Sequence, residues 1–345
     1  MMEQAIRNFN KQFAWKPVML GSTSKTPKEV EPKRFTKFVV GGMGGSHLAA
    51  GLLAGSKPEL DIVIHRDYGL PELSDATERL FIASSYSGNT EETMDFVQVA
   101  HKRGHAVATI SVGGKLLEFA QKNKLPHIVI PDTKIQPRSA LGFSMNALAA
   151  LVGGGKILKE LSGLVDVLKP DELEAKGKAL ASALRGKVPV VYASTRNKAV
   201  AYNWKIKFNE TGKIPAFYNV FPELNHNEMT GFDVILTTEG LSRKFHFVFL
   251  TDNADHPQVQ RRMQVTKKLY EARGLPVTEV ALDNTPSPTQ SRSAPLDKGD
   301  TTLEKIFSSL LIADWTALHL SKIYGTEAEA VPMVEEFKKL INGNK

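Results

Sequence analysis

The sequence predicts an α/β fold made of two doubly wound parallel sheets, and three observations support this. Short runs of β-branched and aromatic residues are followed by glycine- or serine-rich turns and then by helical stretches, an alternation typical of parallel sheets. This alternation occurs twice along the chain. The chain has 345 residues, which suits two domains of roughly 100–200 residues each. Since 42% of the residues are hydrophobic, both domains can bury a core.

The first domain is expected at residues 36–155. Residues 1–35 are polar and contain Pro17, Pro27 and Pro32, which indicates an N-terminal helix followed by an irregular arm. The regular elements expected in the first domain are strands at Phe38–Val40, Ile62–Ile64, Leu80–Ala83, His105–Ile110 and His127–Ile130, and a helix at Glu91–Arg103.

A mostly helical linker is expected at residues 156–185, and the strand–helix order then restarts in a second domain at 186–345. The strands expected there are Val188–Ser194, Phe217–Val220, Phe245–Leu250 and Val277–Leu282, and the helices are Asn197–Thr211, Thr301–Tyr324 and Val331–Leu340. Residues 284–300 are rich in proline, serine and aspartate, which predicts a loop. No tandem sequence repeat accompanies the similarity between the two domains.

Composition excludes several classes of protein. The chain has no cysteine, which excludes disulfides, thiolate metal sites and cysteine nucleophiles. It has no apolar run of about 18 residues, so no membrane span is expected. The segment Met1–Arg7 lacks the apolar core of a signal peptide, so we expect a cytoplasmic protein.

The net charge of +7 indicates either an ordinary solvated surface or attraction of an anionic substrate. Nucleic-acid binding is not expected, because the basic residues are scattered and form no arginine-rich block. His246 and His256 lie outside any ligand-like spacing, so no metal site is expected.

The segment Gly41–Ser46 follows a predicted strand and opens a predicted helix. Glycines let the backbone approach a ligand closely, and a helix N-terminus presents free N–H groups to an anion. The dinucleotide-binding fingerprint fits poorly, because Gly42 and Gly44 match its first two glycines but His47 stands at the third. Asp67 could serve as its acidic residue. Anion binding, dinucleotide binding and a tight turn therefore all stay open for this loop.

Hydroxyl side chains surround a glycine in the segment Ser85–Thr90, between a buried strand and a helix. Hydroxyls and backbone N–H groups can bind all the oxygens of a phosphate without a metal. A plainer alternative is a capped helix with Thr90 as the N-cap. Neither this loop nor the glycine loop ends in the Lys-Ser/Thr of a nucleotide P-loop. A monophosphate is therefore a better ligand than a nucleoside triphosphate.

The most polar motif is Phe221–Glu228, which contains two carboxylates and an imidazole. Glu210 lies 16 residues upstream of His226, at the end of a helical run. A carboxylate and an imidazole on adjoining elements can share proton-transfer work. Glu223 and Glu228 are better interpreted as orienting or interface residues than as catalysts. Together with an anion-binding loop, the motif indicates an enzyme that acts on a phosphorylated small molecule.

The candidate residues also have plainer interpretations. Glu210 could be a solvated helix carboxylate paired with Lys207 or Lys213. His226 could be a hydrogen-bonded structural histidine. His47, beside the glycine loop, is better interpreted as a local hydrogen-bonding residue than as a ligand of a bound group.

Five segments carry a resemblance to a known family, the bifunctional phosphoglucose/phosphomannose isomerases. The segment Ser85–Thr90, called the hydroxyl loop from here on, resembles the phosphosugar-binding loop of flavodoxin-like sugar isomerase (SIS) domains. The polar motif within Phe221–Glu228 matches the family's Glu-x-Asn-His-Asn-Glu. The other segments resemble the family's Pro-Arg segment, its upstream Asn-Glu and its C-terminal lysine helix. In this sequence the five are Ser85–Thr93, Glu223–Glu228, Pro137–Gly142, Phe208–Glu210 and Pro332–Lys338. Together with the matching positions Gly45 and Ser46 in the glycine loop, they spread from about residue 40 to 340, nearly the whole chain.

The resemblance implies a role for each matching residue. Glu210 is the base that moves a proton between C1 and C2, and Arg138 stabilises the enediolate. His226 helps to open the sugar ring and comes from the partner subunit of a homodimer. Lys338, or its neighbour Lys339, assists ring opening. Arg138 and Lys338 could instead be an ion-pair arginine and a surface lysine. The residues implied to hold the phosphate are Gly45, Ser46, Ser85, Ser87 and Thr90.

The implied reaction is the aldose–ketose isomerisation of glucose 6-phosphate and fructose 6-phosphate through a cis-enediol or enediolate, with mannose 6-phosphate as a further candidate substrate. A carboxylate, a guanidinium and an imidazole suffice for this chemistry, so no cofactor and no metal is expected. Val331 stands where family members often carry threonine, which leaves the acceptance of both C2 epimers open. The alternatives are a non-catalytic SIS regulator that binds a phosphosugar, and an aminosugar isomerase. The latter needs an ammonia-generating domain for which the chain has no room.

Overall fold

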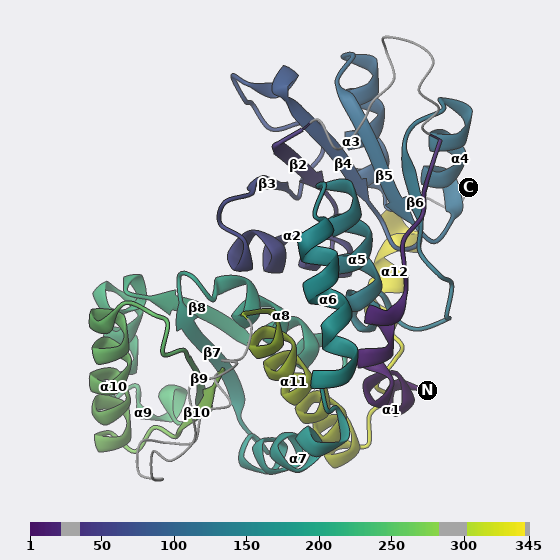
Figure 1. The fold of residues 1–345 in the computed structure, drawn as a ribbon. Helices are drawn as coiled ribbons and strands as arrows, with labels where there is room; N and C mark the ends of the chain where they lie inside the picture. The colour runs from purple at the N-terminus through teal and green to yellow at the C-terminus, as the bar shows by residue number, and fades with distance from the viewer. Residues whose placement is uncertain (22–34, 283–301, 342–345) are drawn as a thin grey trace, which may run out of the picture. The chain divides into compact units, whose positions relative to one another are not determined.

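The computed structural model describes residues 1–21, 35–282 and 302–341, and each of its two compact units is described here by itself (Figure 1). One unit comprises residues 7–169 with 301–304, and the other comprises 1–6, 170–300 and 305–345. The predicted linker thus divides between them after Lys169. The predicted loop at 284–300 and most of the predicted arm, including Pro27 and Pro32, lie outside the described residues.

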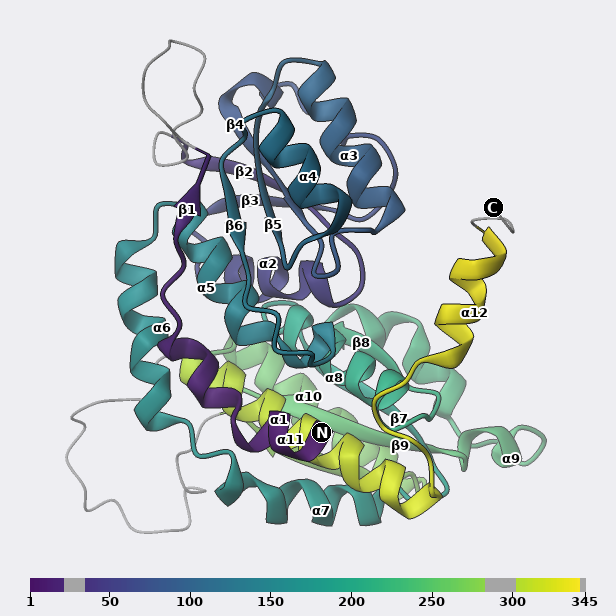
Figure 2. The ribbon, with the colours of Figure 1, turned by 90° about the vertical axis from the view of Figure 1, so that its right-hand side faces the viewer.

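The sheet of the first unit has the strand order β1-β6-β5-β4-β2-β3. Its strands are β1 (Met19–Leu20), β2 (Lys37–Gly41), β3 (Asp61–His65), β4 (Arg79–Ser84), β5 (Ala106–Ser111) and β6 (His127–Val129). The five predicted strands are confirmed, and they are parallel. β1 pairs with β6 in the antiparallel direction at the sheet edge (Figure 2). It was not expected, because two residues in a polar arm carry no strand pattern.

Helices cover both faces of this sheet. They are α2 (Gly45–Ser56), α3 (Glu91–Lys102), α4 (Gly114–Lys122), α5 (Leu141–Leu151) and α6 (Gly155–Val167). α3 and α4 lie on one face, and α2 and α5 lie on the other (Figure 1). Alternate strand residues such as Val39, Phe81 and Val107 meet Phe96 and Leu116 in the core beneath α3 and α4. The short helix η1 (Phe9–Ala14) packs against α5 and α6.

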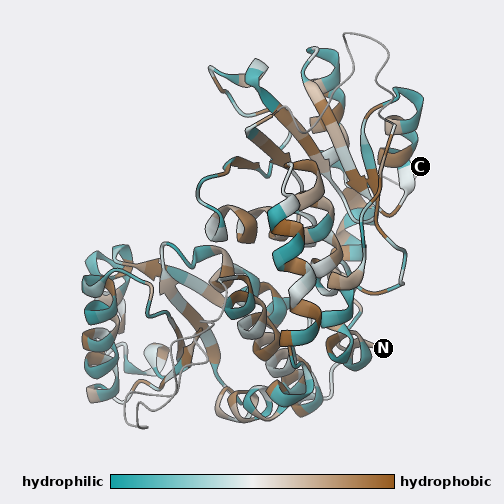
Figure 3. Ribbon diagram, in the orientation of Figure 1, coloured by the Kyte–Doolittle hydropathy of each residue, from teal (hydrophilic) through white to brown (hydrophobic). Residues whose placement is uncertain are grey.

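The second unit contains a four-stranded parallel sheet of order β10-β9-β7-β8. Its strands are β7 (Val188–Ser194), β8 (Phe217–Phe221), β9 (Phe245–Thr251) and β10 (Val277–Ala281). Its longer helices are α7 (Glu174–Ala183), α8 (Lys198–Glu210), α10 (Pro257–Ala272), α11 (Thr302–Tyr324) and α12 (Pro332–Ile341), and α1 (Met2–Arg7) is the predicted N-terminal helix. The strands are largely apolar, as the brown colouring of Figure 3 shows. An aromatic core beneath α10 includes Tyr192, Phe247 and Tyr270.

The strand order of each sheet creates one point where the chain path reverses. β2 lies between β3 and β4, and β7 lies between β8 and β9. The loops that leave the carboxyl ends of β2 and β4 therefore diverge, as do those that leave β7 and β9. Ligands of open α/β sheets bind in the crevice at such a point.

No helix within residues 1–21, 35–282 and 302–341 combines the length and apolar character needed to cross a membrane.

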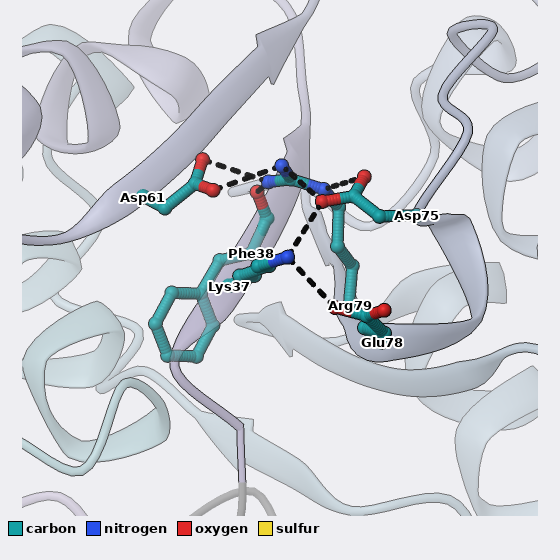
Figure 4. A network of polar contacts seen from close by, with 6 residues as sticks. All are labelled: Lys37, Phe38, Asp61, Asp75, Glu78 and Arg79. Carbon is teal, nitrogen blue, oxygen red and sulfur yellow. Dashed lines mark hydrogen bonds and ion pairs between the residues drawn. The ribbon is translucent and has the colours of Figure 1, made fainter.

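A charged cluster lies at the amino edge of the first sheet (Figure 4). The guanidinium of Arg79 is buried between two carboxylates, donating to Asp61 at 2.8 and 2.9 Å and to Asp75 at 2.7 and 2.9 Å. Lys37 donates to Asp75 at 3.0 Å and to Glu78 at 2.7 Å. Hydrogen bonds from Arg79 and then from Lys37 hold the pKa of Asp75 well below its usual range. The cluster thus ties together the amino ends of β2, β3 and β4.

Replacing Arg79 tests this cluster. Arg79→Met leaves Asp61 and Asp75 without their shared cation, so we expect the midpoint of thermal unfolding near pH 7 to fall by about 2–6 °C. Circular dichroism measures it. Lys134→Met is the control, because the Lys134–Asp132 pair is exposed and such pairs contribute little. An unchanged midpoint in Arg79→Met would contradict a stabilising role for this cluster.

The same cluster predicts a pH dependence. A carboxyl group with a lowered pKa in the folded protein adds stability above its unfolded pKa, and that stability is lost as pH falls toward the folded pKa. The unfolded value for Asp75 is 3.8. We therefore expect the wild-type midpoint to fall more steeply than that of Arg79→Met below about pH 4. Parallel curves in an acid titration would show that Arg79 is not the cause.

Candidate functional site

The glycine loop joins β2 to α2 at the switch point of the first sheet. Gly44 has φ +51°, a conformation that favours glycine. A Cβ on Gly45 would lie 3.0 Å from both the nitrogen of Arg138 and the carbonyl carbon of Pro137. Gly44 thus permits the turn, and Gly45 lets the chain approach the Pro137–Arg138 segment closely.

Two hydrogen bonds join the glycine loop to the end of β4. The backbone N–H of Tyr86 donates to Ser46 Oγ at 2.8 Å, and Ser84 Oγ donates to the carbonyl oxygen of Ser46 at 2.9 Å. The two loops predicted to bind an anion are thereby held side by side.

The hydroxyl loop is closed by its own side chains. The hydroxyl oxygens of Ser85 and Thr90 lie 2.9 Å apart, and the backbone N–H of Gly88 donates to Ser85 Oγ at 3.1 Å. Thr90 occupies the N-cap position of α3, but its side chain makes no capping hydrogen bond. Ser85 is buried, Thr90 is half-buried and Ser87 is exposed. Ser87 and Thr90 are therefore the two hydroxyls that reach solvent.

Gly88 fixes the shape of this loop. Its φ is +70°, and a Cβ there would lie 1.8 Å from the carbonyl oxygen of Gly113. The backbone N–H of Leu116 donates to the carbonyl oxygen of Gly88 at 2.9 Å. Only glycine fits this close packing, so position 88 holds the hydroxyl loop against the turn that starts α4.

Arg138 lies in the short helix η4 (Pro137–Ser139), and only 2% of its surface is exposed. Gln12 anchors this segment, because its amide donates to the carbonyl oxygen of Ser139 at 2.7 Å and accepts from the N–H of Gly142 at 3.0 Å. The structure thus buries the guanidinium of Arg138. The backbone of Arg138 lies close to Gly45 of the glycine loop.

His47 follows the glycine loop and is buried. Burial, with a smaller contribution from the nearby positive charge of Arg66, lowers the pKa of His47 to about 4. The ring is therefore neutral near pH 7 and adds no positive charge to the loop.

Glu210 lies in the second unit, as the last residue of α8, and is half-buried. The two lysines near Glu210 make different contacts. Lys207 pairs with Asp314. Lys213 Nζ donates to the backbone carbonyl of Glu210 at 2.5 Å and also to that of Ala330. Lys213 therefore ties the end of α8 to the segment that leads into α12.

His226 ends the short helix η6 (Glu223–His226), which follows β8. The ring is exposed and makes no hydrogen bond with any residue that the structure describes. Beside it, Asn227 Nδ2 donates to Glu223 Oε1 at 2.8 Å. The prediction that Glu223 orients its neighbours agrees with this contact, while the imidazole itself stays accessible.

Glu228 is held by one side chain from β7 and one from β8. The hydroxyl of Tyr192 and the side-chain amide of Asn219 both donate to its carboxylate. Burial raises the pKa of Tyr192, so its hydroxyl stays protonated and donates. Burial also raises the pKa of Tyr270, the next ring in this core, to about 12. Glu228 thus anchors the polar motif to the aromatic core.

The strand–helix–strand path places Glu210 and His226 at opposite edges of the second sheet. β7 and β8 are parallel, and Ser194 lies beside Phe221 at their carboxyl ends. α8 has 13 residues and returns over about 18 Å to the amino edge, where Glu210 lies. His226 follows β8 at the carboxyl edge. Shared proton-transfer work by Glu210 and His226 therefore stays a prediction, in which His226 comes from the partner subunit.

Lys338 and Lys339 are both exposed on α12. The apolar residues of this helix are exposed as well, among them Met333, Phe337 and Leu340. Their spacing gives one apolar stripe along the helix.

The switch point of the second sheet carries carboxylates where the first carries hydroxyls. Asp252 and Asp255 follow β9 and are buried. Ser194 Oγ donates to Asp255 at 2.6 Å, and Asn197 Nδ2 donates to Asp252 at 3.1 Å. Burial raises the pKa of Asp255. This crevice is unsuited to a phosphate, because its acidic groups repel one.

The structure thus brings six predicted site residues together at the first switch point, and these are Gly45, Ser46, Ser85, Ser87, Thr90 and Arg138. The other three, Glu210, His226 and Lys338, belong to the second unit. Sequence reasoning missed the Lys207–Asp314 pair. Its one signal was a single carboxylate in the apolar run Leu310–Trp315.

The chain is similar to several known proteins. A family model described as the bacterial phospho-glucose isomerase C-terminal SIS domain matches residues 173–341. The bifunctional phosphoglucose/phosphomannose isomerase of Caldicellulosiruptor bescii is 34% identical over 326 residues, which cover 90% of each chain. The protein of the same name from Aquifex aeolicus is 30% identical over 345 residues and 97% of each chain.

Among solved structures, the C-terminal domain of glucosamine-fructose-6-phosphate aminotransferase from Francisella tularensis aligns with a TM-score of 0.65 over 96% of each chain, at 12% identity. This likeness in fold confirms the predicted class of two doubly wound parallel sheets, and the family model names the second as a SIS domain.

Gly88→Ala tests the hydroxyl loop as an anion site. The added methyl group meets the Gly113 carbonyl, so the loop must move, and we expect affinity for inorganic phosphate to fall about tenfold or more. Isothermal titration calorimetry measures it. Gly104→Ala is the matched control, since Gly104 has φ +75° but open space around its Cβ position. Phosphate affinity equal to wild type in Gly88→Ala would rule this loop out as the binding element.

Proposed function

The chain belongs to the family of bifunctional phosphoglucose/phosphomannose isomerases, and on that premise we propose that it interconverts glucose 6-phosphate and fructose 6-phosphate and also accepts mannose 6-phosphate. The observation that carries the proposal is the assembly of a glycine loop, a hydroxyl loop and a buried arginine at one switch point. The names of the relatives support both aldose substrates. A non-catalytic regulator is not favoured, because these relatives are enzymes.

In the proposed site, the phosphate binds at the first switch point. The N–H group of Gly45 at the start of α2 suits an anion, whereas that of Ser46 donates to the carbonyl oxygen of Met43 at 3.0 Å. Ser87 and Thr90 offer hydroxyl donors, and Ser85 holds Thr90 in place through their 2.9 Å contact. Domain 36–155 supplies this binding element in our proposal, and domain 186–345 supplies the base.

The proposed chemistry moves one proton between two carbons and one between two oxygens. The carboxylate of Glu210 takes the proton from C2 of the aldose, the electron pair forms the double bond between C1 and C2, and the carbonyl electrons move to O1 of the enediolate. The same carboxyl group then delivers its proton to C1, while O2 loses its proton to become the ketose carbonyl and O1 gains one. Arg138 stabilises the negative oxygen of the enediolate, a contact that can contribute roughly 3–4 kcal/mol in a buried site. Lys338 and His226 assist ring opening.

We also propose a homodimer in which His226 serves the partner's site. Three features support this. His226 is exposed, it lies at the sheet edge opposite to Glu210, and large apolar side chains beyond it are exposed. Ile235, Leu236 and Leu241 are 57%, 90% and 71% exposed. Exposed apolar groups of this kind are typical of a surface that another subunit covers. We place the enzyme in the cytoplasm, where phosphorylated hexoses are metabolised.

A coupled assay with glucose 6-phosphate and mannose 6-phosphate side by side tests the function. We expect turnover of both by the wild type. Glu210→Gln removes the base, so kcat should fall about 10²–10⁴-fold while KM changes little. Glu271→Gln, in the last turn of α10 of the same unit, is the control and should keep wild-type kcat.

Two results would count against these assignments. Near-full turnover in Glu210→Gln would remove it as the base. Thermal stabilisation of the wild type by fructose 6-phosphate without any turnover would favour the regulator instead.

Mixing two inactive variants tests the shared site. A heterodimer of His226→Ala and Glu210→Gln has one intact site if His226 crosses the interface. Random pairing of equal amounts should then restore about a quarter of wild-type activity. Mass spectrometry confirms that subunits have exchanged. If exchange occurs and no activity returns, His226 acts within its own chain or not at all.

A further inference from the structure

Two polar pairs of buried residues join α8 to α11 in the second unit. Trp204 Nε1 donates to Ser309 Oγ at 2.9 Å. One turn later on α8, Lys207 Nζ lies 2.6 Å from Asp314 Oδ1. Only 2% of Lys207 is exposed, and Asp314 is buried as well. This is a complete ion pair inside a helix–helix interface.

Stability does not explain such a pair. Moving an ammonium and a carboxylate out of water carries a large desolvation cost, and their attraction often only offsets that cost. Apolar side chains of similar volume commonly give equal or greater stability at the same position. Lysine is also among the residues least often buried. What the pair does provide is a fixed direction and distance between two helices.

The Lys207–Asp314 pair lies near the C-terminal end of α8, which ends at Glu210. Lys207 is three residues before Glu210, so its ammonium holds the turn that carries the proposed base. The backbone carbonyl of Lys207 also accepts the N–H groups of Thr211 at 2.9 Å and of Gly212 at 3.1 Å, which closes the helix. Helix ends otherwise fray, because their last carbonyls have no intrahelical partner.

We propose that Lys207 and Asp314 form a positioning pair that fixes the last turn of α8 and thereby the carboxylate of Glu210 for proton transfer. The inference rests on the proposed role of Glu210. Lys207 and Asp314 do not touch the substrate in this proposal. They act by restricting rotation and fraying of the helix end, and a base misplaced by about 1 Å can lose about 100-fold in rate.

The double variant Lys207→Met with Asp314→Leu separates positioning from stability. It replaces both charges by apolar groups of similar size, so the thermal midpoint should stay equal or rise. We expect kcat for glucose 6-phosphate to fall about 10–100-fold. KM should stay within about threefold, because the phosphate loops are untouched.

Ser309→Ala is the matched control in the same interface. It removes the partner of Trp204 one turn farther from Glu210, so it should lower the thermal midpoint and leave kcat unchanged. Lys207→Arg is a second test variant, because it keeps the charge but moves it; we expect an intermediate loss of kcat. If the double variant does not fold at the assay temperature, Lys207→Arg decides by the same criterion.

These experiments distinguish a failure of the positioning role from a failure of the proposed function. An inactive wild type refutes the function. An active wild type with wild-type kcat in the folded double variant overturns the positioning role. An equal loss of kcat in Ser309→Ala also overturns it, since any loosening of the interface would then suffice.

Discussion

The position of β2 between β3 and β4 is the constraint on which the binding element depends. Parallel strands end at the same edge, and the loops of β2 and β4 leave that edge on neighbouring strands. The hydrogen bond from Tyr86 N–H to Ser46 Oγ then fixes one loop against the other. Without this strand order, neither the glycines nor the hydroxyls would lie near the buried guanidinium of Arg138.

Most strands and the hydroxyl loop could be predicted from the sequence, because their patterns are local. Strands such as Phe38–Val40 and the hydroxyl loop carry their patterns within a few residues. Two features could not be predicted from local patterns. The role of Arg138 came only from resemblance, because one arginine beside a proline has no distinctive pattern. The Lys207–Asp314 pair joins residues 107 apart, and only helix packing brings them together.

The relative placement of Glu210 and His226 within one chain follows from the strand–helix–strand path. A crossover helix runs antiparallel to its strands, so a residue at its end and a residue after the next strand must lie at opposite edges. Adjacency in sequence therefore does not bring two such residues together within one chain. The two units also show that one fold can carry opposite electrostatics. Hydroxyls and glycines line the first switch point, and buried Asp252 and Asp255 line the second.

The Arg79 cluster separates what stabilises the first sheet from what the sheet binds. Arg79 begins β4, and Ser84 ends it next to the hydroxyl loop, so about 17 Å of strand lies between them. An engineer can therefore alter charges at the amino edge to tune heat or acid tolerance while the loops keep their shape. The same separation would let related chains drift in stability between habitats without changing their substrate.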